Sequence, residues 1–167
     1  MRCAICGLPG TVQDHWQDDS HATEIISGLL VGGTHNAKNT NELRHWRVGL
    51  VINLVAQESN YPRQCGIKYE TRSWRDCESF SIVREATEIA SLIHEALQSQ
   101  TVVLVHCRIG SSRSVAAVMA YLILKRHLTV AQALNLVQTK RGIAHPDKFL
   151  PQLSQLAGRE SQVASDH

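Results

Sequence analysis

The stretch that decides the fold runs from Thr101 to Leu124 and reads TVVLVHCRIGSSRSVAAVMAYLIL. Residues 101–105 form a β-branched apolar run, which is typical of a buried strand. Residues 114–124 are almost wholly apolar and predict a buried helix. Between them lies a short loop of small and flexible residues, in which Cys107 and Arg113 stand six positions apart. The sequence therefore predicts a strand, a tight loop and a helix in direct succession.

This succession predicts a binding site for an anion. The loop amides and the unpaired N–H groups at the start of the helix point at one spot, where the helix dipole favours negative charge. A cysteine at a helix N-terminus has its pKa lowered to about 3.5–7.5. We therefore expect the loop to hold both a tetrahedral dianion and a thiolate nucleophile.

Length and composition indicate one ordinary folded domain. The chain has 167 residues, of which 43% are hydrophobic and 19% charged, and its net charge of +2 is too small to indicate nucleic acid or a membrane surface. No apolar run approaches the ~18 residues of a membrane span, and no secretory signal is visible. Five scattered cysteines favour a reducing compartment, so we expect the cytoplasm, or the nucleus.

The periodicity predicts strands that alternate with helices. Expected strands cover 24–26, 29–31, 48–55, 67–70 and 101–105, and expected helices cover 39–46, 80–98, 113–126, 129–139 and 146–158. Capping boxes are expected at Asn39 and Thr129. The expected fold class is α/β, with a central mixed, partly parallel sheet flanked by helices and a ligand site at the carboxyl ends of the strands.

Both ends of the chain are polar and lack periodicity. We expect a flexible N-terminal arm over 1–22, one domain over 23–158 and a flexible tail over 159–167. Cys3, Cys6, His15 and His21 offer four zinc ligands, but the histidines are unusually placed and a second cysteine pair is missing. The preferred interpretation is a free arm without metal. The Lys140-Arg141 pair is expected to complement a helix dipole.

The motif His106-Cys107-x-x-Gly110-x-Ser112-Arg113-Ser114, followed by an apolar helix with Ala-Tyr-Leu, resembles the dual-specificity phosphatases of the cysteine-based protein tyrosine phosphatase superfamily. The resemblance extends from about residue 23 to 156, and further matches occur at 29–32, 51–54 and 146–153. It implies a protein tyrosine phosphatase-like fold, and makes 23–158 the catalytic domain. It also implies hydrolysis of phosphotyrosine and phosphoserine/threonine monoesters through a phosphocysteine intermediate, without a cofactor.

The resemblance also implies roles for the loop residues. Cys107 attacks phosphorus, Arg113 donates to two phosphate oxygens, and Ser114 helps the thiolate leave in the second step. His106 orders the loop and is not the base. The remaining substrate contacts are expected from the backbone amides of Arg108, Ile109, Gly110, Ser111 and Ser112. The side chains of Arg108, Ser111 and Ser112 are expected to point away from the phosphate.

The resemblance also implies a general acid, an aspartate on a separate upstream loop. Asp76 fits this place, two residues after Trp74, with Glu78 and then Glu70 as alternatives. A helix cap or a plain polar loop residue is the competing interpretation of Asp76. Cys77, its neighbour, is a candidate for a disulfide with Cys107 under oxidation.

Two other functions remain open at this point. A phosphatase for RNA 5′ ends or phosphoinositides would use the same loop, but such relatives often carry extra basic residues there, and this loop has only Arg108 besides Arg113. A phospho-binding module without turnover would usually lack the nucleophile or the arginine. In the superfamily that the chain resembles, tyrosine-specific members deepen the pocket with an additional loop that contains an aromatic residue. No such loop is visible in this sequence, so a shallow pocket is expected. We expect a monomer with a phosphoprotein substrate, and neither nucleic acid nor a membrane as partner.

Overall fold

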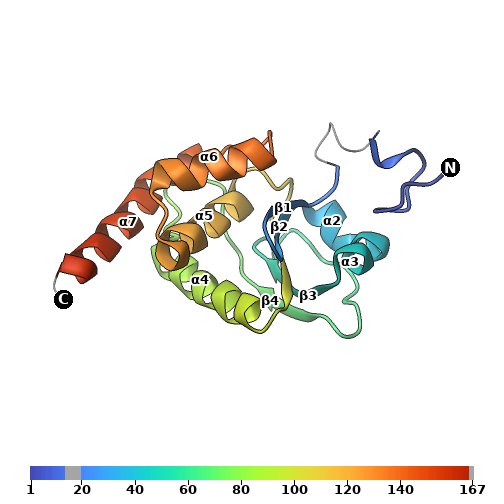
Figure 1. Ribbon diagram of the computed structural model, residues 1–167, viewed down its shortest axis with the longest axis horizontal. Coiled ribbons are helices and arrows are strands. Elements are labelled where there is room, and N and C mark those ends of the chain that lie inside the picture. Colours follow the sequence, from blue (N-terminus) through green and yellow to red (C-terminus); the bar gives the residue numbers. More distant parts are fainter. Residues whose placement is uncertain (14–19, 166–167) are drawn as a thin grey trace.

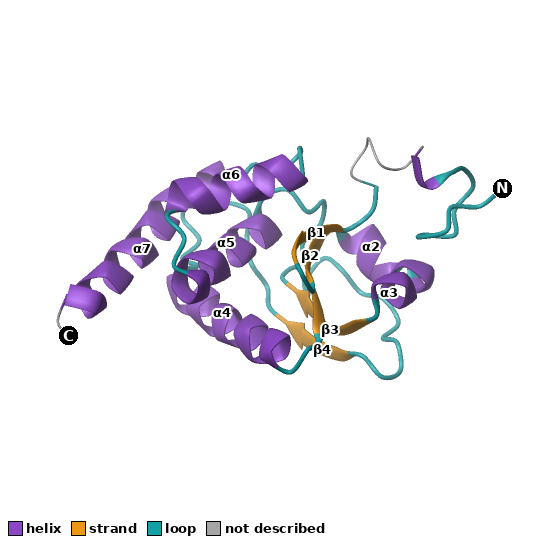
Figure 2. Cartoon of the chain, in the orientation of Figure 1, coloured by secondary structure: helices purple, strands orange, loops and turns teal. Residues whose placement is uncertain are grey.

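A five-stranded mixed sheet lies at the centre of the computed structural model, which describes residues 1–13 and 20–165. The strands stand in the spatial order β1-β2-β5-β3-β4, with bounds β1 Thr23–Ile26, β2 Leu29–Gly32, β3 Val48–Asn53, β4 Lys68–Thr71 and β5 Val102–His106. Only β1 is antiparallel to its neighbour, and the other pairs are parallel. The predicted α/β class is confirmed (Figure 2).

Helices cover both faces of the sheet (Figure 1). One face carries α2 (Thr34–Lys38) and α3 (Thr40–Trp46), and the other carries α4 (Val83–Gln98), α5 (Arg113–Arg126), α6 (Val130–Lys140) and α7 (Leu150–Ser165). The larger core lies between the sheet and the second group. Residues 113–123 of α5 are all buried, which explains why that helix is apolar on every side.

The expected helix caps form at the start of α3 and α6. The side chain of Asn39 accepts from the amide of Glu42 at 3.0 Å, and Thr129 and Gln132 bond reciprocally. The carboxylate of Glu42 does not complete a capping box, because it accepts from the amide of Ala22 and the side chain of Asn36 instead. Helix α2 was not expected, since five residues are too short to show helical periodicity.

The two ends of the chain differ from the expectation. A 3₁₀ turn at Asp147–Phe149 leads into α7, which continues through Gly158 rather than ending there. A glycine inside a helix costs only about 1 kcal/mol, so it is no obligatory stop. Cys3, Ile5 and Cys6 are buried in a small cluster, so the described part of the expected loose arm is packed. The domain boundaries stay predictions.

Across the ranges 1–13 and 20–165, no helix combines the length and the apolarity that crossing a lipid bilayer requires.

Candidate active site

The predicted anion-binding loop lies at the carboxyl end of the central strand β5. Cys107 is the first residue after that strand, and Arg113 is the first residue of α5. The loop forms the floor of a pocket whose lining residues are Glu58, Asp76, Cys107, Arg108, Ile109, Ser111, Ser112 and Arg113. Asp76 is thus brought to the loop, whereas neither Glu70 nor Glu78 lines this pocket.

The start of α2 holds the first carbonyl groups of the loop. The hydroxyl of Thr34 donates to the carbonyl oxygen of Cys107 at 3.2 Å, and the amide of Thr34 donates to that of Arg108 at 3.0 Å. Because β2 pairs with β5, the Gly32-Gly33 turn delivers Thr34 to this edge of the sheet.

The later carbonyl groups of the loop are held from the opposite end of the chain. The guanidinium of Arg141 donates to the carbonyl oxygens of Gly110 (2.7 Å) and Ile109 (3.3 Å), and the amide of His145 donates to that of Ser111 (2.6 Å). Arg141 lies at the end of α6, as expected, but it is fully buried and its guanidinium bonds the loop carbonyl groups.

These bonds fix the direction of the loop amides. Five consecutive carbonyl groups, from Cys107 to Ser111, accept hydrogen bonds from the surrounding scaffold. In a trans peptide the N–H points opposite to the carbonyl of the same unit. The amides of residues 108–112 are therefore turned toward the pocket, which creates a surface of donors for an anion.

Gly110 cannot be replaced without moving this loop. Its φ of +83° lies in the region that favours glycine, and a Cβ atom there would lie 2.6 Å from the carbonyl carbon of Gly32. The same atom would lie 2.7 Å from the Arg141 guanidinium.

The thiol of Cys107 is surrounded by donors. Burial raises its pKa, but hydrogen bonds with Ser114 and from the amide of Gly110, together with the Arg113 charge, bring the pKa below its ordinary value. The Sγ atom lies 3.2 Å from the Ser114 hydroxyl and 3.3 Å from the Gly110 amide. These donors favour the thiolate form of Cys107 over that of an ordinary cysteine.

His106 is held as a neutral ring beneath the loop. Burial lowers its pKa to about 4. Its Nδ1 lies 3.1 Å from the carbonyl oxygen of Cys107, which only accepts, so Nδ1 carries the proton. Its Nε2 then accepts from the Tyr61 hydroxyl at 2.7 Å. The imidazole thus supports the loop and has no free position for proton transfer.

Arg113 is a buried cation whose Nε donor is unpaired. Its Nη1 donates to the carbonyl oxygen of Trp74 at 3.1 Å and lies 3.6 Å from a carboxylate oxygen of Glu58. Within the described ranges, its buried Nε has no hydrogen-bond partner. An oxygen of a bound oxyanion would satisfy that donor.

Asp76 is fixed at the rim by two side chains from other elements. Its Oδ1 accepts from the Ser112 hydroxyl at 2.9 Å, and its Oδ2 lies 3.3 Å from the Lys148 ammonium. That ammonium also donates to the backbone carbonyl of Asp76 at 3.1 Å. The carboxylate is therefore positioned above the loop rather than capping a helix.

Several contributors to the site were not predicted from the sequence. The Gly32-Gly33 pair and Thr34, which follow the expected strand 29–31, could have indicated a second turn at the same sheet edge. Sequence pattern offered no comparable signal for the others, which approach from distant segments: Glu58, Tyr61, Arg141 and Lys148.

The two secondary cysteine hypotheses fare differently. The Cys77 thiol lies 3.4 Å from the Ser79 hydroxyl, a contact that lowers its pKa, and its crosslink to Cys107 stays a prediction. Cys3, Cys6 and His21 come together, whereas His15 lies outside the described residues.

Comparison with known proteins identifies related chains. The family model "Dual specificity phosphatase, catalytic domain" matches residues 29–159. Human dual specificity protein phosphatase 26 is 37% identical over 150 residues, which are 86% of this chain and 70% of that protein. Dual specificity protein phosphatase 1 of Arabidopsis thaliana is 34% identical over 152 residues, covering 90% and 75%.

Solved structures share the fold. The crystal structure of DUSP15 superposes with a TM-score of 0.79 at 27% identity, covering 86% of this chain and 91% of that one. The human tyrosine phosphatase-like serine/threonine/tyrosine-interacting protein gives a TM-score of 0.77 at 25% identity, covering 83% and 97%.

Proposed function

The chain belongs to the dual specificity phosphatase family and is a protein phosphatase, and we propose that its reaction is carried by Cys107, Arg113, Asp76 and Ser114. The strongest support is the placement of a low-pKa thiol under five inward-turned amides and beside a buried arginine. This arrangement suits a phosphoryl group, whose three oxygens need many donors at once.

In the first step, the Cys107 thiolate attacks phosphorus and the bond to the leaving oxygen breaks. Arg113 and the amides of residues 108–112 hold the phosphoryl oxygens, and protonated Asp76 gives its proton to the leaving oxygen. Asp76 then takes a proton from water, which attacks the phosphocysteine and releases phosphate. Ser114, 3.2 Å from the sulfur, stabilises the departing thiolate.

The pocket lining favours substrates of both phosphotyrosine and phosphoserine/threonine type. None of the described residues that line the pocket is aromatic, and the exposed Ile109 lies at its rim. Without an aromatic wall, a pocket has no feature that selects the long phosphotyrosine ring. Arg108 and Arg113 are the two cations of this lining, which favours a phosphoprotein over a more highly charged RNA end or phosphoinositide.

We also propose that the enzyme is a cytoplasmic or nuclear monomer that needs no nucleic acid or membrane as partner. Five cysteines without disulfide bonds, one of them the proposed nucleophile, suit a reducing compartment. A phospho-binding module is the second candidate, since a phosphatase-like interacting protein shares the fold. The presence of nucleophile, arginine and acid in one pocket favours turnover.

Hydrolysis of an aryl phosphate and of matched phosphotyrosine and phosphothreonine peptides tests this proposal. Cys107→Ser should abolish hydrolysis of all three, while Cys65→Ser, which changes an exposed cysteine, should not. Asp76→Asn should slow the phosphothreonine peptide more than an aryl phosphate with a good leaving group. Retained activity in Cys107→Ser would overturn the nucleophile assignment, and equal slowing by Asp76→Asn would remove that residue from the acid role.

A further inference from the structure

Two cysteines and a histidine form a buried cluster away from the active site. One Sγ or imidazole nitrogen from each of Cys3, Cys6 and His21 lies within 4.8 Å of the others. The exposed fractions of these residues are only 3%, 4% and 6%. From this juxtaposition we propose that the chain binds one zinc ion through Cys3, Cys6 and His21.

The distances suit a single ion. With Zn–S and Zn–N bonds of about 2.3 and 2.0 Å, a sulfur and a nitrogen on one tetrahedral zinc lie about 3.5 Å apart. The Cys3 sulfur and the Nε2 of His21 are 3.4 Å apart. Structural zinc takes four ligands, so the proposed site has one position besides those that Cys3, Cys6 and His21 fill.

The backbone folds the two cysteines into a closed turn. The amide of Cys3 donates to the carbonyl oxygen of Leu8, and the amide of Gly7 donates to that of Cys3, both at 2.9 Å. Arg2 and Pro9 form an antiparallel bridge at the base. Gly7 adopts a φ of +73°, which lets the chain reverse directly after the second cysteine. A Cys-x-x-Cys pair in such a turn presents both sulfurs to one ion.

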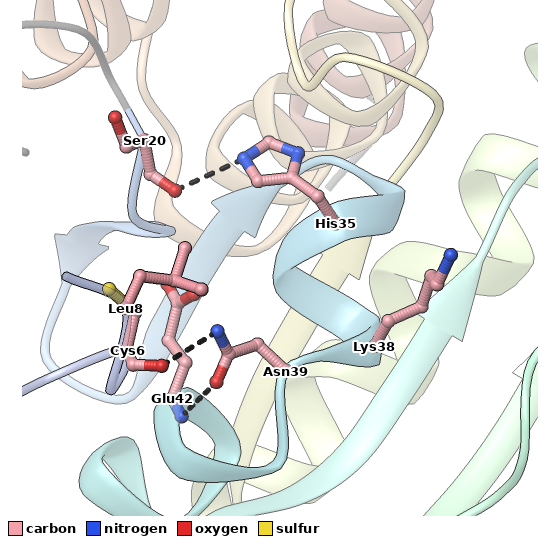
Figure 3. Close-up of a pocket in the computed structure, with 7 residues that line it drawn as sticks. All are labelled: Cys6, Leu8, Ser20, His35, Lys38, Asn39 and Glu42. Carbon is pink, nitrogen blue, oxygen red and sulfur yellow. Dashed lines mark hydrogen bonds between the residues drawn. The ribbon is translucent and has the colours of Figure 1, made fainter.

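The turn is fixed to the domain at the start of α3. The Asn39 side chain donates to the carbonyl oxygen of Cys6 at 2.9 Å, and Figure 3 shows the Cys6 sulfur on the side away from that amide. Gly7 lies so close to Asn41 that an added Cβ would be 2.4 Å from its amide nitrogen. The ligands are thus held before an ion binds, which lowers the entropic cost of coordination.

The donor set selects zinc. Thiolate and imidazole ligands suit zinc, whereas magnesium and calcium require oxygen. None of the five cysteines forms a disulfide bond in the structure. The site lies outside the residues matched by the family model, which begin at 29.

The zinc site would brace the catalytic loop. The backbone carbonyl of His21 accepts from Nη1 of Arg141 at 3.1 Å, and Nε of the same guanidinium holds the Gly110 carbonyl. Arg141 therefore joins His21, one of the three proposed zinc ligands, to the loop through its buried side chain.

Metal analysis of the full chain, produced with zinc supplementation and purified under reducing conditions, tests the proposal. Wild type should carry about one zinc per chain, and Cys3→Ser and His21→Ala should carry less than about a tenth of that. The matched controls Cys65→Ser and Cys107→Ser should keep the metal, which separates this site from zinc on the catalytic thiol. Wild type loaded with cobalt should show a thiolate-to-cobalt charge-transfer band. Added zinc should raise the Tm of metal-free wild type.

Metal-free wild type under these conditions, or a Cys3–Cys6 disulfide in its place, would overturn the proposal. So would zinc retained in Cys3→Ser, or zinc lost in Cys107→Ser. If the ligand variants fail to fold, the cobalt spectrum of wild type decides, because absence of the charge-transfer band excludes thiolate ligands.

Discussion

Nε of Arg141 donates to the carbonyl oxygen of Gly110 at 2.7 Å, joining the end of α6 to the centre of the catalytic loop. The same guanidinium reaches the Ile109 carbonyl, the Thr23 hydroxyl and the His21 carbonyl. One buried side chain therefore links the loop to the start of β1 and to His21.

Replacing Arg141 should damage both folding and activity. Arg141→Met leaves several buried acceptors unpaired, each costing about 1–3 kcal/mol, so the free energy of unfolding should fall by at least about 3 kcal/mol. The loop amides should no longer be held in their orientation toward the pocket, so kcat/KM should fall about 100-fold or more. Urea unfolding and aryl phosphate kinetics measure the two effects. Arg84→Met, on an exposed position of α4, is the control, and unchanged kcat/KM in Arg141→Met would refute the aiming role.

Gly110→Ala should inactivate the enzyme. The new methyl would need a positive φ, at about 1–2 kcal/mol, and would collide with Gly32 and Arg141. Gly158→Ala is the matched control, because a Cβ there meets open space inside α7 and should stabilise the chain by about 0.5–1 kcal/mol. Wild-type turnover in Gly110→Ala would show that the loop tolerates another conformation.

Ser114→Ala should move the reactivity of Cys107 to higher pH. Loss of the hydroxyl removes the largest of the interactions that lower the thiol pKa, so the pKa should rise toward the ordinary value. Alkylation by iodoacetamide requires the thiolate, and its rate increases as pH passes through that pKa. The pH–rate curve of Ser114→Ala should therefore lie to the alkaline side of wild type. Ser91→Ala, on α4, should superpose on wild type; coincidence of all three curves would contradict the prediction.

Stability should fall in acid because of His106. The pKa of its imidazole is about 4 in the folded chain, against 6.5 for an exposed imidazole, so the unfolded chain binds the extra proton between these limits. The free energy of unfolding should thus decrease as pH falls from about 6.5 to 4, by about 3 kcal/mol from this residue. Urea unfolding of wild type and His106→Asn across this range checks it. An equally steep decline in the variant would assign the effect elsewhere.

The strands and helices around the active site followed from short-range patterns. Residues 101–105 are mostly β-branched, the loop residues after them are mostly small, and residues 114–124 are almost wholly apolar. The structure confirms β5 and α5 in this stretch. The Thr129 capping box was recognisable because its two partners are three residues apart. Helix α2 and the end of α7 were missed, since neither a five-residue helix nor a tolerated glycine leaves a periodic signal.

By itself, the sequence determined the order of strand, loop and helix, and with it the places of Cys107 and Arg113 in the loop, because these depend on residues within a few positions of one another. Tertiary structure alone decided which residues orient the amides of the loop. Thr34 and Arg141 are far from Cys107 in the chain, and an arginine after a helix resembles a surface cation in any sequence pattern. Only the packing of the folded chain buries Arg141. Because a buried guanidinium needs hydrogen-bond acceptors within the protein, it bonds the loop carbonyl groups.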